Sequence, residues 1–454
     1  MKFSRKSVRT KESAIPDLRF EDQRLTSFAG LVVLQKFFQS IQLISQLRQC
    51  FRHLAGGKVF DRATIFLQLI VHLLLGFREL RDSDHYRDDP LVLRVLGLKR
   101  LPDVATLSRM LKEADESSVR KLRQLLGQMV LDRLASLALP RITLDFDGSV
   151  QSTKRRAEGT AVGFNKKKKG ARSYYPLFCT VAQTGQVLSF LHRSGNVHDS
   201  NGARAFILSC VEQVRSVLPG VIIEVRMDSA FFSDEIVTAL NQQNVQFTIS
   251  VPFERFVQLK QMIEQRVRWY DLNEDVSYFE SLWKPKSWSR RCRFLMIRTK
   301  TKKQQKGPVQ LDLFEPYDWG FEFKVIVTNK DLCASGVVSY HEGRGSQEGV
   351  FGELKSHCQM DYIPVRTRRG NETFLLAGLF AFNLIRDLQM QLAPPQRGTT
   401  RKRATLWVFE QVDTLRKTFF STCGPTLSSR RKTNAHLLCG QAPQAASVAN
   451  LPKS

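Results

Sequence analysis

The chain has 454 residues, 42% of them hydrophobic, which is enough for two or three domains with sizeable cores. Lysine and arginine number 69 against 43 acidic residues, so the formal net charge is +26. Such an excess indicates a polyanionic partner, nucleic acid above all, with an anionic membrane surface as the weaker alternative. The longest apolar run, residues 65–75, is too short to cross a bilayer and predicts a buried helix, so we expect no membrane partner.

The eight cysteines are scattered and form no C-x-x-C pair, which argues against a zinc site and a disulfide framework. The basic N-terminal stretch lacks an apolar core, so it does not predict a signal peptide. A reducing cytosol is therefore the expected compartment.

The first part of the chain is predicted to be helical. Residues 1–25 are polar and basic, and we expect a mobile arm there. From residue 27 to about 139, apolar residues such as Leu31 and Leu34 recur at helical spacing, with lysines and arginines on the polar faces. Residues 1–140 are therefore either a helical DNA-binding domain or a solvated helical domain without that role.

Residues 141–150 read RITLDFDGSV, where apolar residues alternate with Thr143, Asp145 and Asp147. A period of two predicts a β-strand that places both aspartates on one face. Two buried acids are costly unless a cation, such as a divalent metal ion, neutralises them. The alternative is an edge strand whose acidic face lies in water.

An α/β pattern follows and continues to residue 251. We expect strands at 143–147, 174–182, 187–191, 221–228 and 245–251, with helices at 200–217 and 234–243. The order of these elements resembles the ribonuclease H-like fold, a mixed sheet with helices, over residues 141–251.

Residues 252–320 interrupt this pattern and are expected to form a partly β insertion that holds four of the five tryptophans. The sheet domain is expected to resume over residues 321–395, with a strand at 323–328 and helices at 339–359 and 374–392. Residues 396–454 form a basic C-terminal region, which has basic clusters at 397–403 and 430–432 and is expected to be disordered after Cys439.

Three acids stand at positions where a site would form. Asp147 and Asp228 both end predicted strands, and the carboxyl ends of strands are where open α/β sheets build sites. On the predicted helix, Glu348 shares a face with Arg344 and Lys355, and we expect it to be half-buried. The alternative is that Glu348 and Arg344, four residues apart, form an ion pair on the surface, and such a pair contributes little to stability.

Two strand-end aspartates and a helical glutamate are hard oxygen ligands of the kind that Mg²⁺ and Mn²⁺ prefer. Two such ions about 3.5–4 Å apart would activate a water or a 3′-hydroxyl and stabilise the leaving oxygen of a phosphodiester.

Three blocks, LDFDGSV, RMDSAFFSDE and YHEGRGSQEGVFGELK, resemble the catalytic blocks of the DDE transposases of bacterial insertion sequences. The likeness is greatest to the subgroup marked by Tyr, Arg, Glu and Lys around the third acid, and it covers roughly residues 101–390. The long interval between the second and third acids also matches family members that carry a largely β insertion there.

The resemblance implies that Asp147, Asp228 and Glu348 are the metal ligands, with two Mg²⁺ or Mn²⁺ ions in the site. It implies that Arg344 and Lys355 contact DNA near the cut, and their spacing from Glu348 is that of the family. Tyr340 departs from the family, because three residues rather than two separate it from Arg344.

The implied function is cut-and-paste transposition by a cytoplasmic, nucleoid-associated bacterial enzyme. It would bind the terminal inverted repeats of its element as a homodimer in a synaptic complex, cleave there and join the 3′ ends to target DNA. The alternatives are an inactive DNA-binding relative and a metal-dependent nuclease that cuts without joining.

Other residues give weaker signals. His198 is expected to be a cap or core histidine rather than a site residue. Trp283, Trp288 and Trp319 are expected either to pack in the insertion or to stack on an unpaired base near the cut. A basic run either contacts DNA phosphates or forms a solvated turn. This run consists of Lys166, Lys167, Lys168 and Lys169.

Overall fold

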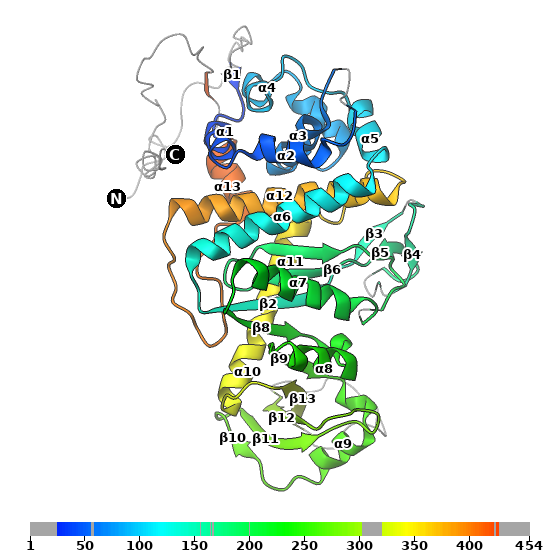
Figure 1. The fold of residues 1–454 in the computed structure, drawn as a ribbon, viewed down its shortest axis with the longest axis vertical. Coiled ribbons are helices and arrows are strands. Elements are labelled where there is room, and N and C mark those ends of the chain that lie inside the picture. The colour runs from blue at the N-terminus through cyan, green and yellow to red at the C-terminus, as the bar shows by residue number, and fades with distance from the viewer. Residues whose placement is uncertain are drawn as a thin grey trace, which may run out of the picture.

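The computed structural model describes residues 25–421, except 56–58, 155, 164, 166–167, 199 and 302–319, together with the backbone of 424–425. Helices gather at one end of the molecule, a mixed sheet lies in the middle, and the inserted strands form the other end (Figure 1). Residues 1–24 of the predicted N-terminal arm, the basic cluster at 430–432 and the predicted disordered tail lie outside the described residues.

The predicted helical pattern of residues 27–139 is confirmed. Aspartates cap several of these helices; Asp103, for example, accepts a hydrogen bond from the Thr106 N–H at 2.7 Å. The elements are α1 (Leu31–Ser40), α2 (Leu43–Phe51), α3 (Arg62–Leu74), a 3₁₀ helix (Leu80–Tyr86), α4 (Pro90–Leu96), α5 (Val104–Lys112) and α6 (Glu116–Leu137).

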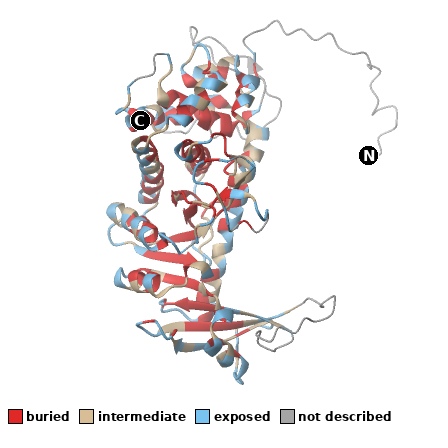
Figure 2. Ribbon diagram, turned by 90° about the vertical axis from the view of Figure 1, so that its right-hand side faces the viewer, coloured by how far each residue is buried: buried red, intermediate tan, exposed pale blue. Residues whose placement is uncertain are grey.

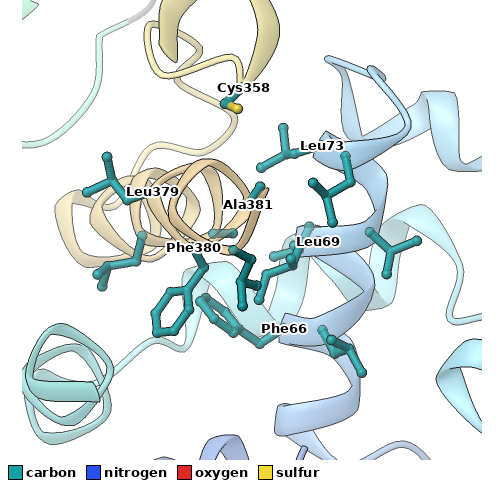
Figure 3. Packing of buried hydrophobic residues seen from close by; sticks show 14 of the residues in the cluster. Phe66, Leu69, Leu73, Cys358, Leu379, Phe380 and Ala381 are labelled. Atoms are coloured by element: carbon teal, nitrogen blue, oxygen red, sulfur yellow. The ribbon is translucent and has the colours of Figure 1, made fainter. Parts of the chain in front are cut away.

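Helix α3 is the buried helix predicted from the apolar run, and it packs against α12 (Arg368–Leu392), which lies far along the chain (Figure 3). The rings of Phe66 and Phe380 meet edge to face with centroids 5.7 Å apart. One hydrophobic cluster runs from α1 through α12 and reaches Phe178 of the sheet. The N-terminal helices therefore share a core with the second half of the chain. No described helix is both long and apolar enough to cross a bilayer.

The central sheet has the expected ribonuclease H-like order. Strand β2 (Arg141–Gly148) pairs antiparallel with β6 (Leu177–Val181), which pairs with β7 (Val187–Leu191). On its other side β2 runs parallel to β8 (Ile222–Met227), which runs parallel to β9 (Gln246–Val251). Strand β2 is thus an interior strand, and the edge-strand interpretation of its aspartates is wrong.

The two faces of this sheet differ in chemistry. The apolar face packs on α7 (Ala203–Val217) and α8 (Asp234–Gln242), with Phe146 and Phe206 in edge-to-face contact at 5.9 Å. The central strands are largely buried, whereas the helices packed on them have both buried and exposed residues (Figure 2). On β2, β8 and β9 the opposite face is polar, and the elements that carry the site cover it.

The inserted residues extend the same sheet. After α9 (Val257–Glu264) come β10 (Tyr270–Asp271), β11 (Val276–Trp283) and β12 (Cys292–Lys300). They join β13 (Phe321–Thr328), which pairs antiparallel with β9, so one sheet has nine described strands. The insertion is therefore partly β, as predicted.

The run predicted as one strand over 174–182 is divided. Pro176, which has no N–H to donate, separates β5 (Arg172–Tyr174) from β6. Strand β5 lies in a small sheet with β3 (Gln151–Thr153) and β4 (Ala161–Val162), which the sequence did not predict.

The helix predicted over 339–359 is also divided, into α10 (Ala334–Glu342), a 3₁₀ turn (Gly343–Gly345) and α11 (Ser346–His357). A Cβ atom on Gly343 would lie 1.9 Å from the Lys402 carbonyl oxygen and 2.1 Å from Arg226 Nη1. Gly343 is therefore packed against a distant segment, which leaves no room for a side chain in this turn.

After α12 the chain returns to the sheet, where the Leu406 N–H donates to the Gln183 carbonyl at 2.9 Å. The last described elements are α13 (Val412–Leu415), a π-helical turn (Arg416–Phe420) and β14 (Gly424–Pro425), which pairs briefly with β1 (Leu25–Thr26).

Candidate active site

On the adjacent strands β2 and β8, every second side chain is polar, and these polar side chains lie on the same face of the sheet. In the parallel register Asp145 lies opposite Arg226 and Thr143 opposite Glu224. The side chains that share this face are Thr143, Asp145 and Asp147 on β2 and Glu224, Arg226 and Asp228 on or just after β8.

Asp147 and Asp228 are neighbours at the carboxyl ends of these strands. Phe146 pairs with Met227 in the register, and each aspartate is the next residue along its strand. Both are half-buried. Asp147 Oδ1 accepts a hydrogen bond from the Gly148 N–H at 2.7 Å, and Asp228 Oδ1 accepts one from the Ala230 N–H at 3.0 Å. The local backbone therefore orients both carboxylates.

Arg344 reaches the same strand end from the turn between α10 and α11. Its Nη1 donates to Asp147 Oδ2 at 3.3 Å, and the two side chains are 22% and 21% exposed. Among the described residues Arg344 forms its ion pair with Asp147 and not with Glu348. The interpretation of Arg344 and Glu348 as a surface ion pair is therefore wrong, because Arg344 pairs with Asp147 instead.

Glu348 lies in the first turn of α11, close to the end of β2. Its neighbour Gln347 donates from Nε2 to the Asp145 carbonyl at 3.0 Å. One turn later Phe351 packs on Phe178 with ring centroids 5.3 Å apart. Gln347 and Phe351 lie on the buried face of α11, so Glu348 lies on its exposed face. The prediction that Glu348 is half-buried is therefore wrong. Lys355, one turn further, is half-buried.

In the described part of the chain, no group of three or more His, Cys, Asp or Glu side chains is close enough to hold a metal ion. The donor chemistry fits a divalent cation on the aspartate pair, because both members offer carboxylate oxygens from adjacent strand ends. In this conformation Glu348 does not complete a group of three with them.

Arg226, which the sequence reading did not single out, neutralises Asp145. Its Nε and Nη2 donate to the two carboxylate oxygens at 2.6 and 2.7 Å, and the two side chains are 0% and 1% exposed. The available signal was the sequence position, because Arg226 precedes Asp228 by two residues as Asp145 precedes Asp147.

Glu224 is the second buried acid of this face. It accepts hydrogen bonds from Lys330 Nζ at 2.6 Å and Arg403 Nε at 3.0 Å, and also from the Thr143 hydroxyl at 2.9 Å. Burial raises the pKa of Glu224, but the hydrogen bonds and charges of Arg403 and Lys330 outweigh burial and lower the pKa from 4.5 to about 2. Glu224 is therefore ionised at neutral pH.

His341, on α10, covers the neighbouring strand β9. Its two ring nitrogens lie 2.9 Å from the Thr248 hydroxyl and 2.8 Å from the Ser250 hydroxyl. Burial, and then the charges of Lys324, Arg344 and Arg226, lower its pKa well below 6.5, so the ring is neutral. The polar face of the sheet thus fixes α10 by side-chain hydrogen bonds.

The comparison with protein families identifies the chain. A family model described as "Transposase DDE domain group 1" matches residues 10–452. The chain belongs to this transposase family.

No curated protein matches this transposase-family chain. Among solved structures, the piggyBac transposase synaptic complex with hairpin DNA is 12% identical, with a TM-score of 0.41 over 87% of this chain and 80% of that chain. The Mos1 transposase paired-end complex with left transposon end is 12% identical, with a TM-score of 0.17 over 43% of this chain and 60% of that chain. At these scores the likenesses add nothing to the family assignment.

The remaining residues predicted for a DDE transposase are only partly described. Lys168 and Lys169 are exposed on a turn before β5, and Lys166 and Lys167 lie outside the described residues. His198 is exposed, and its Nδ1 accepts a hydrogen bond from the Ser200 N–H at 3.2 Å. It therefore closes a local turn before α7 and is not a core histidine.

The insertion tryptophans are packing residues where they are described. Trp288 is 7% exposed and stacks on Phe232 with centroids 4.6 Å apart. Trp283 packs edge to face on Phe294 at 5.1 Å, and its indole N–H donates to Gln258 at 3.3 Å. Trp319 lies outside the described residues. The packing interpretation holds for Trp288, which is buried too deeply to stack on a base.

Proposed function

We propose that this chain is a cut-and-paste DNA transposase that cleaves at the ends of its own element and joins the 3′ ends to target DNA. The observation that carries the proposal is the placement of Asp147 and Asp228 side by side at adjacent strand ends, in a chain of the DDE transposase family. Asp147, Asp228 and Glu348 are the proposed ligands of Mg²⁺ or Mn²⁺.

Bound metal ions would activate a water or a 3′-hydroxyl and stabilise the leaving oxygen. The protein's own residues set the geometry of this reaction. The backbone bonds of Gly148 and Ala230 orient the two aspartates before substrate binds. Glu348, exposed in the first turn of α11, would be the third residue to hold the metal ions.

Two cations are proposed to hold the scissile phosphate. Arg344 already contacts Asp147 at 3.3 Å, so a phosphate bound beside the aspartates lies within its reach. Lys355 follows Glu348 by two turns on α11. Guanidinium and ammonium groups bind phosphate oxygens strongly at short range.

The substrate is proposed to be duplex DNA. The net charge of +26 supports binding to a polyanion, and exposed Lys168 and Lys169 add positive charge after β3 and β4. We assign recognition of the terminal inverted repeats to the helices within residues 1–140, and we propose two copies of the chain in the synaptic complex.

The test is to incubate the full chain with Mg²⁺ and a linear DNA that carries the element's own ends, and to map every product. A transposase yields cleaved 3′ ends and then joined products. Cleavage without joining would identify a nuclease, and binding without cleavage would identify an inactive relative. The matched control is a DNA with scrambled ends, which a transposase should leave intact.

A further inference from the structure

The guanidinium of Arg226 joins three separate parts of the chain. Besides its two bonds to Asp145 on β2, its Nη1 donates to the Tyr340 carbonyl at 3.0 Å and to the Lys402 carbonyl at 2.6 Å. The first carbonyl belongs to the end of α10 and the second to the segment after α12. Arg226 itself is fully buried on β8.

The segment around Lys402 is pressed against the turn that carries Arg344. Gly343 leaves no room for a side chain, since a Cβ would meet the Lys402 oxygen at 1.9 Å. Lys402 Nζ also pairs with Glu342 at 3.3 Å. The turn between α10 and α11 is therefore held between Arg226 and the C-terminal segment.

Arg403 fixes that segment to the sheet. It donates from Nε and Nη2 to the carboxylate of Glu224 at 3.0 and 3.3 Å. Tyr340 fills the space between these charges, with Lys330 Nζ 4.2 Å and the Arg226 guanidinium 5.3 Å from its ring centroid. The basic cluster at 397–403 thus contributes Arg403, which is half-buried, to the polar face of the sheet.

We propose that Arg226, the Lys402 backbone and Arg403 are positioning elements of the reaction, because they fix the Gly343–Gly345 turn and so place Arg344 and Glu348 against the aspartate pair. The proposal rests on the proposed function of that site. It gives Tyr340 a place inside this assembly and makes the C-terminal segment a structural part of the catalytic centre.

Stability alone does not explain this arrangement. A buried ion pair is often no more stabilising than well-packed apolar side chains of similar volume. The guanidinium adds a fixed orientation, since its four hydrogen bonds reach three groups: the Asp145 carboxylate on β2, the Tyr340 carbonyl on α10 and the Lys402 carbonyl after α12. A displacement of about 1 Å in a reacting group lowers a rate by about 100-fold.

The first test replaces the pair by apolar residues of similar size, Asp145→Leu with Arg226→Met, in the full chain. We expect a folded protein whose cleavage rate at saturating DNA is about 100-fold lower, while the DNA concentration for half-maximal rate is unchanged. The exposed Arg401→Gln, in the same segment, is the matched control. A folded double variant that cleaves like wild type would overturn the proposal.

The second test needs no change of charge and also decides the matter should the double variant fail to fold. Gly343→Ala forces the turn away from Lys402, whereas Gly352→Ala on α11 meets nothing within 4 Å. We expect the first to lose about 100-fold in cleavage rate and the second to behave like wild type. Equal rates for the two variants would contradict the proposal.

Amide hydrogen exchange of residues 343–348 tests the positioning role of Arg226 independently of the proposed transposase activity. Faster exchange there in Gly343→Ala and in the double variant, but not in Arg401→Gln, is expected with or without DNA. If wild type does not cleave, the proposed function fails, and unchanged exchange in the variants would overturn the positioning role separately.

Discussion

Asp145 and Arg226 face each other across two adjacent parallel strands, and two hydrogen bonds of 2.6 and 2.7 Å join them inside the protein. Asp147 lies two residues further along the same face, half-buried and in contact with Arg344. The two aspartates of one strand therefore have different surroundings. The inner one is neutralised by the protein, and the outer one lies at the strand end beside Asp228.

Exchanging each aspartate for asparagine should separate these roles. Asp147→Asn should abolish metal-dependent cleavage with little change in stability. Asp145→Asn should lower the free energy of unfolding by about 3–5 kcal/mol, because it leaves Arg226 buried without a charged partner. The Asp145→Asn molecules that remain folded should still cleave DNA, at a rate lowered by roughly 10–100-fold. Denaturant melts and cleavage assays in Mg²⁺ and Mn²⁺ measure both, and an active Asp147→Asn beside a stable but dead Asp145→Asn would reverse the assignment.

Neutralising either remaining acid should remove cleavage while leaving DNA bound. Asp228→Asn and Glu348→Gln keep the shape of each side chain but weaken metal binding. We expect rate losses larger than the roughly 10–100-fold that changing an outer partner of a metal site costs. Cleavage rates and DNA affinity are measured together, with exposed Glu264→Gln on α9 as the control. Wild-type cleavage by either variant would show that its acid is not a ligand.

Glu224 should make stability depend on pH in acid. Its pKa is lowered from 4.5 to about 2 in the folded protein, so its stabilising effect is complete above about pH 4.5 and is lost as the pH falls toward 2. The shift corresponds to about 3 kcal/mol. Glu224→Gln should flatten this part of the stability curve and lower stability at pH 7, where Lys330 and Arg403 lose their carboxylate. Unfolding is followed by denaturant titration between pH 2 and 7, and a curve parallel to wild type would refute the prediction.

The features that could be predicted from the sequence are those that depend on local residue patterns and on the order of elements along the chain. Alternation identified β2 and both of its aspartates, and the apolar run identified α3, because each pattern reflects burial of one face. The partner of Asp145 escaped prediction, since Arg226 meets it only through the register of two strands 81 residues apart. The packing of Gly343 against Lys402 escaped prediction for the same reason, because the two residues lie on segments far apart in the sequence. The exposure of Glu348 depends on which neighbours, Gln347 and Phe351, reach the sheet.

Binding to the element's ends should weaken steeply with salt. Each neutralised phosphate releases counterions, so the logarithm of affinity should fall with a slope of about −0.9 per contact on duplex DNA. Exposed Lys99 and Arg100 are tested by alanine substitution in the full chain, because the N-terminal helices share their core with α12. Loss of a contact at either position should make the slope shallower by about 0.9. An affinity that does not change with salt would contradict phosphate binding.

Arg344 offers the sharpest separation between a catalytic role and a structural one. Its pair with Asp147 at 3.3 Å is single and partly exposed, and pairs of this kind contribute only about 0–1 kcal/mol to stability. Arg344→Ala should therefore leave the melting temperature within a few degrees of wild type. Its cleavage rate should nevertheless fall strongly, since the guanidinium that we propose to hold the scissile phosphate is gone. Arg344→Lys keeps the positive charge but loses the planar guanidinium that can donate two parallel hydrogen bonds, so it should recover part of the cleavage rate.

Lys355→Ala should show the same pattern, and exposed Arg401→Ala should lose neither stability nor cleavage rate. Thermal melts and single-turnover cleavage decide between the roles: a large drop in melting temperature with normal specific activity would make Arg344 a structural partner of Asp147.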